Sequence, residues 1–310
     1  MTAKRRILVI SGILWLSTPL LVCAQDRHGS STILTMMTQV NAELAAQGAR
    51  IRLNQLELYT QGWGQPENRV LMTGSRWVPY DENRGATGLL GDQLTYLVAE
   101  SRGETASGLA NWETESAIDQ AMATWNSQKS LEKVGLWKAP APDWDCTIFD
   151  EMDCWAAYDD DPRPGYPFFA DIVHAGWYPY GFFECFGPGG GHGILGVSVT
   201  FIWVDSETGQ PSDINGDNYL DTALVEIYYN DYFGDGAGGR AGNPWGIDAD
   251  LPGIDVETVA LHESGHALGL GHFGPPPAAV MNPYYEGIDQ TPATIDTAGL
   301  SALYRSWPNP

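Results

Sequence analysis

The sequence predicts an α/β (α+β) fold in which a twisted mixed β-sheet is backed by helices. Two patterns predict it: short apolar runs typical of strands, and apolar residues repeated at helical spacing. From about Trp77 the order is strand, helix, three strands and two helices, which suits one sheet covered by helices. The expected strands are 94–99, 170–174, 194–204 and 223–229, and the expected helices are 112–127, 256–270 and 297–307.

A helix and a strand are also expected before this region. Residues 32–47 repeat apolar residues at helical spacing, Gly48 ends the helix, and residues 51–58 follow as a strand. We interpret residues 25–75 as a helix-strand extension of unknown role and residues 76–310 as the main domain.

The first residues indicate where the protein works. Three basic residues precede an apolar run over residues 7–22, and small residues follow it, as at a signal-peptide cleavage site. We therefore expect residues 1–24 to be removed on export to the extracellular space or the periplasm. A lipoprotein signal that lipidates Cys23 ranks second, because Val22 stands where a small residue is expected.

The exported chain would be strongly acidic. The formal net charge is −23 at pH 7, and removing residues 1–24, which hold three basic and no acidic residues, lowers it to −26. Such a surface repels nucleic acid and anionic membranes, so we expect neither nucleic-acid binding nor membrane insertion after the signal is removed. The acidity favours either calcium binding or a general adaptation to an extracellular environment, and the composition leaves both open.

One segment, HESGHALGLGH, supplies three histidines and a glutamate at the spacing of a catalytic zinc site. On a helix, His262 and His266 project from the same face, and the carboxylate of Glu263 can reach a metal-bound water. Gly269 can take positive φ at little cost, so it ends the helix and lets His272 return to the metal. Three imidazoles leave the fourth tetrahedral position open to water, as in catalytic zinc sites.

This segment resembles the active site of the metzincin metallopeptidases, most closely the matrixin branch. The resemblance covers the chain from about Trp77 onward and implies a zinc-binding active-site helix and a methionine turn in the sheet-and-helix fold. It identifies His262, His266 and His272 as the zinc ligands and Glu263 as the general base.

The methionine turn is expected at Met281, nine residues after His272. The prolines at 275–277 form a stiff loop that can bring this methionine beneath the site. By the same resemblance, Pro283 and Tyr285 form the wall of the pocket that receives the side chain after the scissile bond. Packing of Tyr285 against the final helix is an alternative interpretation, and Pro283 stands where some relatives carry a catalytic tyrosine, so we assign none.

A calcium loop is a second candidate metal site. Asp213, Asn215, Asp217 and Asp221 place oxygen ligands as in the first nine residues of an EF-hand-type loop. Leu224 stands where that loop requires a bidentate glutamate. Calcium binding and a plain Asp/Asn turn are therefore both open.

The remaining cysteines and histidines suggest structural roles. Cys146 and Cys154 bracket a short acidic loop and can form a disulfide in an oxidising compartment, which leaves Cys185 unpaired unless it bonds one of them. No segment resembles the cysteine switch of many matrixins. His174 and His192 lie in segments similar to a matrixin structural-metal loop, but its acidic ligand is absent, so we expect loop residues rather than metal ligands.

These features predict a secreted zinc-dependent endopeptidase that acts as a monomer on protein or peptide substrates. An extended substrate is expected to add as an edge strand, while zinc activates water and Glu263 transfers its proton. The alternative is an acidic, calcium-stabilised extracellular binding protein with a vestigial metal site. The intact Glu263 argues against this alternative.

Overall fold

The computed structural model describes residues 32–61, 72–81, 83–84, 91–100, 102–140, 147–150, 170–233 and 243–307. The expected signal peptide with Cys23 and the expected Cys146–Cys154 disulfide lie outside these residues. Within the described part, no helix has the length and apolar character needed to span a bilayer.

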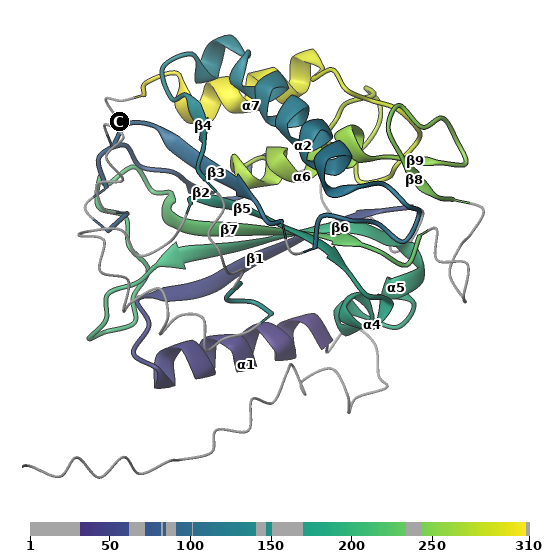
Figure 1. Ribbon diagram of the computed structural model, residues 1–310. Coiled ribbons are helices and arrows are strands. Elements are labelled where there is room, and N and C mark those ends of the chain that lie inside the picture. Colours follow the sequence, from purple (N-terminus) through teal and green to yellow (C-terminus); the bar gives the residue numbers. More distant parts are fainter. Residues whose placement is uncertain are drawn as a thin grey trace, which may run out of the picture.

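A mixed seven-stranded sheet forms the centre of the molecule, and a two-stranded sheet lies beside it (Figure 1). The strands are β1 (Ile51–Thr60), β2 (Ser75–Arg76), β3 (Leu94–Val98), β4 (Leu136–Lys138), β5 (Ile172–Tyr178), β6 (Ile194–Trp203), β7 (Leu220–Asn230), β8 (Trp245–Gly246) and β9 (Ile254–Asp255). The main sheet has the order β1-β6-β7-β5-β3-β4, with β2 paired to β7, and β8 pairs with β9. β6 is antiparallel to both β1 and β7, whereas β7, β5, β3 and β4 are parallel to one another.

Helices cover both faces of the main sheet. They are α1 (Thr32–Ala46), α2 (Asn111–Asn126), α4 (Tyr180–Phe183), α5 (Gly190–Gly193), α6 (Val256–Ala267) and α7 (Thr294–Tyr304), with short 3-10 helices η3 (Lys129–Leu131) and η4 (Glu184–Phe186). Figure 1 shows α2, α6 and α7 on one face and α1, α4 and α5 on the other. This arrangement confirms the predicted mixed sheet backed by helices.

Each face of the sheet has its own hydrophobic core. On one face, Met122 and Trp125 of α2 pack with residues of α6 and α7 against the sheet. On the other, Met36, Val40 and Leu44 of α1 pack against β1, β6 and β7. The helix-strand unit at the beginning of the chain is therefore part of the layered structure, because α1 closes the second core and β1 is the edge strand of the main sheet.

All nine predicted elements have a counterpart, with shifts at their ends. β5 begins two residues later than expected and continues to Tyr178. α7 begins at Thr294 because the Asp296 carboxylate accepts the N–H of Ala293 at 2.7 Å and caps the helix. The elements that the sequence did not predict have only two to four residues, too few to show a period.

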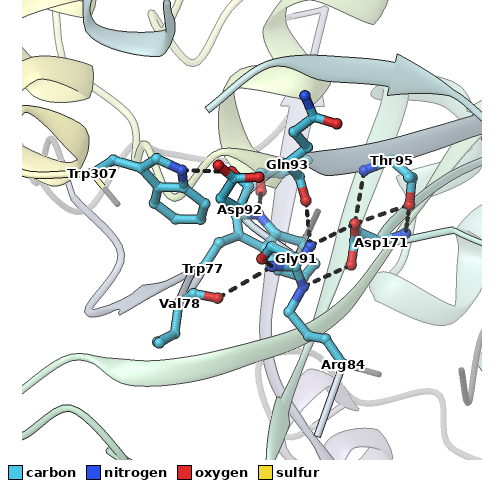
Figure 2. Close-up of polar contacts among 10 residues, drawn as sticks. Trp77, Val78, Arg84, Gly91, Asp92, Gln93, Thr95, Asp171 and Trp307 are labelled. Carbon is cyan, nitrogen blue, oxygen red and sulfur yellow. Dashed lines mark hydrogen bonds and ion pairs between the residues drawn. The ribbon is translucent and has the colours of Figure 1, made fainter. Parts of the chain in front are cut away.

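A buried ion pair joins the loop before β3 to the start of β5 (Figure 2). The Asp171 carboxylate accepts the Nε–H and Nη2–H of Arg84, both at 2.9 Å. It also accepts the N–H of Thr95 at 2.7 Å and its hydroxyl at 2.9 Å. Asp171, the residue before β5, is thereby bonded to Thr95, the second residue of β3, at the end where these two strands begin to pair.

Candidate active site

Helix α6 carries the first two histidines into the interior of the molecule. Asp255 caps the helix by accepting the N–H of Thr258 at 2.8 Å. The indole N–H of Trp125 donates to the carbonyl oxygen of Leu261 at 2.7 Å and holds α2 against α6. His262 and His266 lie four residues apart on this buried helix, with exposed fractions of 0% and 2%.

The turn after α6 returns His272 to the other two histidines. Gly269 has φ of 87°, as the sequence predicted, and a Cβ there would lie 3.0 Å from the carbonyl oxygen of Ser75. The Nε2 atoms of the three histidines are 3.0 Å apart for His262 and His266, and 3.2 Å for each of the other two pairs. The structure thus brings the three predicted ligands together.

Each imidazole is oriented through its Nδ1 atom. His262 Nδ1 donates to the carbonyl oxygen of Val280 at 2.6 Å, and His266 Nδ1 donates to that of Leu270 at 2.7 Å. His272 Nδ1 lies 3.3 Å from the Glu57 carboxylate. With the proton on Nδ1, each Nε2 presents a lone pair to the centre of the cluster, which is the tautomer that a metal requires.

The cluster fits a zinc ion. Burial lowers the pKa of His266 to about 4 and that of His272 to about 3, and it holds the pKa of His262 well below its ordinary value. All three are therefore neutral at pH 7, as ligation requires. Tetrahedral zinc with Zn–N bonds of about 2.0–2.1 Å sets its ligand atoms about 3.3 Å apart, close to the spacing here. Three facing lone pairs without a donor between them are satisfied by a cation.

Glu263 lies beside the cluster and is fully buried. Its Oε2 accepts the hydroxyl of Ser198 in β6 at 2.6 Å, and its Oε1 has no hydrogen-bond partner among the described residues. Burial raises the pKa of Glu263 well above its ordinary value, although Ser198 and the backbone N–H of Tyr59 act in the opposite direction. This carboxylate can therefore hold a proton next to the site.

Met281 lies directly against helix α6. Its side chain is fully buried, and a Cβ on Gly265 would lie 2.3 Å from its sulfur atom. Asp296 holds this turn by accepting the N–H groups of Val280 at 3.1 Å and Met281 at 3.3 Å. This turn also orients His262, because the Nδ1 of His262 donates to the carbonyl oxygen of Val280.

The segment after Met281 faces the end of β1. Tyr285 is buried, and its hydroxyl accepts the N–H of Asp255 at 2.8 Å. The N–H of Tyr285 donates to the carbonyl oxygen of Thr60 at 2.9 Å, and the carbonyl oxygen of Pro283 accepts the N–H of Thr60 at 3.4 Å. The two predicted wall residues therefore flank the last residue of β1.

In the candidate calcium loop, the acidic and amide side chains form hydrogen bonds with the backbone of the loop itself. Asp213, Asn215, Asp217 and Asp221 each accept a backbone N–H group inside the loop through a side-chain oxygen atom, whereas Asp221 Oδ1 has no hydrogen-bond partner among the described residues. Arg76 forms an ion pair with Asp217. This is the hydrogen bonding of the Asp/Asn turn that the sequence left open. Calcium binding stays a prediction.

The other two histidines lie apart from the cluster. His174 is fully buried in β5, its Nδ1 is 2.8 Å from the hydroxyl of Tyr229, and burial lowers its pKa to about 3. His192 is exposed and packs against Tyr180 and Tyr232, each with a ring-centroid distance of 5.0 Å. Of the described residues, His262, His266 and His272 are the group of metal-ligating side chains whose ligand atoms lie within 4.8 Å of one another.

Cys185, in the short helix η4, is disulfide-bonded. The other cysteines, Cys23, Cys146 and Cys154, lie outside the described residues, so its partner is one of these. The Cys146–Cys154 pairing stays a prediction.

Four residues that complete the site were not predicted: Glu57, Tyr59, Ser198 and Asp296. Two of them left a signal in the sequence. Ser198 is a polar residue inside an apolar strand, and Asp296 lies in the first turn of a helix, where a carboxylate caps free N–H groups. Glu57 and Tyr59 left none, because their contacts depend on where β1 pairs.

Comparison with known proteins agrees with this geometry. The family model for matrixin matches residues 146–305, which is more than half of the 310-residue chain. The chain is 49% identical over 60 residues to mouse (Mus musculus) matrix metalloproteinase-25, covering 18% of this chain and 10% of that protein. It is 33% identical over 135 residues to the human (Homo sapiens) protein of that name, covering 36% and 23%. It is 40% identical over 78 residues to metalloendoproteinase 1-MMP of Arabidopsis thaliana, covering 23% and 20%. The matched regions thus span between a tenth and a quarter of these relatives.

Proposed function

The chain belongs to the matrixin family, and from this premise we propose that it is a zinc-dependent endopeptidase. The observation that carries the proposal is the cluster of three Nε2 atoms, 3.0–3.2 Å apart, beside the buried carboxylate of Glu263. Among the functions that the sequence suggested, only peptide-bond hydrolysis uses both the open ligand set and this carboxylate.

His262, His266 and His272 would hold the zinc ion. When bound, zinc supplies a Lewis acid that polarises a peptide carbonyl and makes water a stronger acid. Glu263 accepts the proton of the attacking water and delivers it to the nitrogen atom of the leaving amine. Ser198 positions Glu263 for this transfer through its 2.6 Å hydrogen bond to Oε2.

The substrate would be an extended protein or peptide segment. Backbone groups of β6 would hold such a segment at the edge that β1 occupies in this structure, and Pro283 and Tyr285 would contact it from the opposite side. We further propose that the enzyme is exported as a monomer, and that residues 76–310 form its catalytic domain behind the extension 25–75.

Glu263→Gln tests the assignment, with Glu257→Gln as the matched control on the same helix. Both proteins are loaded with zinc, and their metal content is measured. Each is then assayed on a peptide library with and without a chelator. Glu257→Gln should cleave peptides internally and lose this activity with chelator, whereas Glu263→Gln should bind zinc and lose at least about 99% of the hydrolysis. Zinc binding without cleavage by the wild-type protein would instead support the binding protein with a vestigial site.

A further inference from the structure

The end of β1 lies across the histidine cluster, between β6 and the segment of Pro283. β1 pairs antiparallel with β6 up to Thr60, and Thr60 pairs in parallel with Tyr284. Thr60 exchanges backbone hydrogen bonds with Pro283 and Tyr285, of 3.4 Å and 2.9 Å. The N–H of the next residue, Gln61, donates to the carbonyl oxygen of Gly193 at 2.7 Å. The chain thus holds its own strand where an extended substrate would add to the sheet.

The side chain of Tyr59 fills the position between the first histidine and the wall. Its ring stacks on that of His262 with a centroid distance of 3.7 Å and an interplanar angle of 12°. It meets Tyr285 edge-on at 6.1 Å, and only 4% of Tyr59 is exposed. The wall residues Pro283 and Tyr285 were predicted to receive the side chain after the scissile bond, and Tyr59 is the side chain they receive.

The peptide groups around Tyr59 also face the residues that would do the chemistry. Tyr59 pairs with Gly196 of β6, where an added Cβ would lie 2.6 Å from Oε1 of Glu263, so the strand pair at Tyr59 packs against this carboxylate. Glu57, two residues earlier, places its carboxylate 3.3 Å from Nδ1 of His272. Residues 57–61 therefore pass His272 at Glu57, and then Glu263 and the wall at Tyr59.

We propose that β1 is an internal, substrate-like occupant of the site and that the bond it presents for cleavage is Leu58–Tyr59. The proposal rests on the proposed function and names its first substrate. A water molecule gives one proton to Glu263, and its hydroxide adds to the carbonyl carbon of Leu58. The bond between this carbon and the nitrogen atom of Tyr59 then breaks, and Glu263 delivers the proton to that nitrogen atom. The products are a carboxylate at Leu58 and a new amino terminus at Tyr59.

This placement has two consequences for external substrates. The edge of β6 is already paired from Ile194 to Trp203, so no other strand can add there while β1 is in place. The position after the scissile bond holds an aromatic ring stacked on an imidazole, so the site should prefer aromatic side chains there.

Self-cleavage is tested on the full chain as purified. Wild-type and Glu263→Gln proteins are prepared free of metal, supplied with zinc, and followed by intact mass and amino-terminal sequencing. The wild type should yield a new terminus at Tyr59 and the Glu263→Gln protein should not. Cleavage of external peptides by a wild-type chain that stays intact at Leu58–Tyr59 would overturn the proposal and leave the proposed function standing.

Variants at Tyr59 test the role of its ring. Tyr59→Phe keeps the stacking on His262 and should be cut at the wild-type rate, whereas Tyr59→Gly should be cut at least about tenfold more slowly. Trp112→Ala is the control, because this aromatic side chain is 70% exposed on α2, and its cleavage rate should match the wild type. Thermal unfolding of each variant shows whether it is folded. Equal rates for the Gly and Phe variants would contradict the placement of Tyr59.

A binding measurement needs no turnover. A fluorescent peptide of residues 54–63 is titrated against full-length Glu263→Gln and against the double variant Glu263→Gln, Tyr59→Gly, whose own strand is weakened. The double variant should bind this peptide at least about tenfold more tightly, because the competing internal strand binds less well. Equal affinities would refute occupancy by β1. If no peptide bond is ever cut but the difference in affinity holds, the proposed hydrolysis fails and the occupancy stands.

Discussion

Asp171→Asn tests whether the ion pair between the loop and the sheet supports the fold that holds the site. The side chains of Arg84 and Asp171 are 7% and 4% exposed, so the substitution removes the carboxylate that forms the buried ion pair with Arg84. An asparagine in the same place also loses at least one of the four hydrogen bonds that the carboxylate accepts, because one oxygen becomes a donor. Breaking such a pair costs about 3–5 kcal/mol, a large part of a domain's total stability of about 5–15 kcal/mol.

Urea unfolding measures this cost, and Lys138→Gln is the matched control. Lys138 bonds Glu115 and Asp119 at 2.5 and 2.6 Å, but its side chain is 32% exposed, so its loss should cost less than about 1 kcal/mol. Arg84→Met combined with Asp171→Asn should cost less than the sum of the single changes, because neither charge is then left alone. A cost for Asp171→Asn equal to that of the control, or strict additivity, would refute the reasoning.

Three further predictions concern the site and its surroundings. Gly265→Ala should destabilise the protein by about 1–3 kcal/mol in urea unfolding, because the new Cβ meets the sulfur of Met281, whereas Gly181→Ala, with open space around it, should be nearly neutral. Burial raises the pKa of Glu226 from 4.5 to about 7, so the neutral form stabilises the fold at low pH. The free energy of unfolding should therefore fall by up to about 3 kcal/mol as pH rises from about 4.5 to about 7, and Glu226→Gln should flatten that profile. Zinc at a thousandfold excess over its Kd should stabilise the protein by about 4 kcal/mol in thermal unfolding, and a gain that persists in His266→Ala would contradict the ligand assignment.

The long elements were predictable because each carries its own period. Strands such as β6 and β7 and helices such as α2 have ten or more residues, enough to show a pattern. The order of the strands in the sheet was not predictable, because strand pairing joins residues that are far apart in the chain. β1 and β6 are separated by more than 130 residues, and nothing within the segment 51–58 indicates which edge it joins.

The residues of the candidate site also fall into two groups, those that the sequence predicted and those that it did not. His262, Glu263, His266, Gly269 and His272 lie within eleven consecutive residues, so one helical turn and one glycine bend suffice to assemble them. Their supporting partners come from elsewhere in the chain and meet them only in the folded state. Ser198 reaches Glu263 from β6, and Asp296 holds the methionine turn from α7, so no local pattern connects these residues to the motif.

The position of β1 also gives a physical reason for the complete burial of His262 and of the proposed general base Glu263. An active site open to substrate leaves its general base within reach of water, yet His262 and Glu263 are both 0% exposed. Tyr59 covers His262, and Gly196, the β6 partner of Tyr59, packs against the Glu263 carboxylate. The sequence contains no segment resembling a cysteine switch, and in our proposal β1 closes the site instead. Strand β1 pairs along β6, and its last residue, Thr60, forms backbone hydrogen bonds with Pro283 and Tyr285. These hydrogen bonds and the ring of Tyr59 exclude solvent from the site. On this proposal, displacement of β1, rather than of a thiolate, precedes cleavage of any other protein.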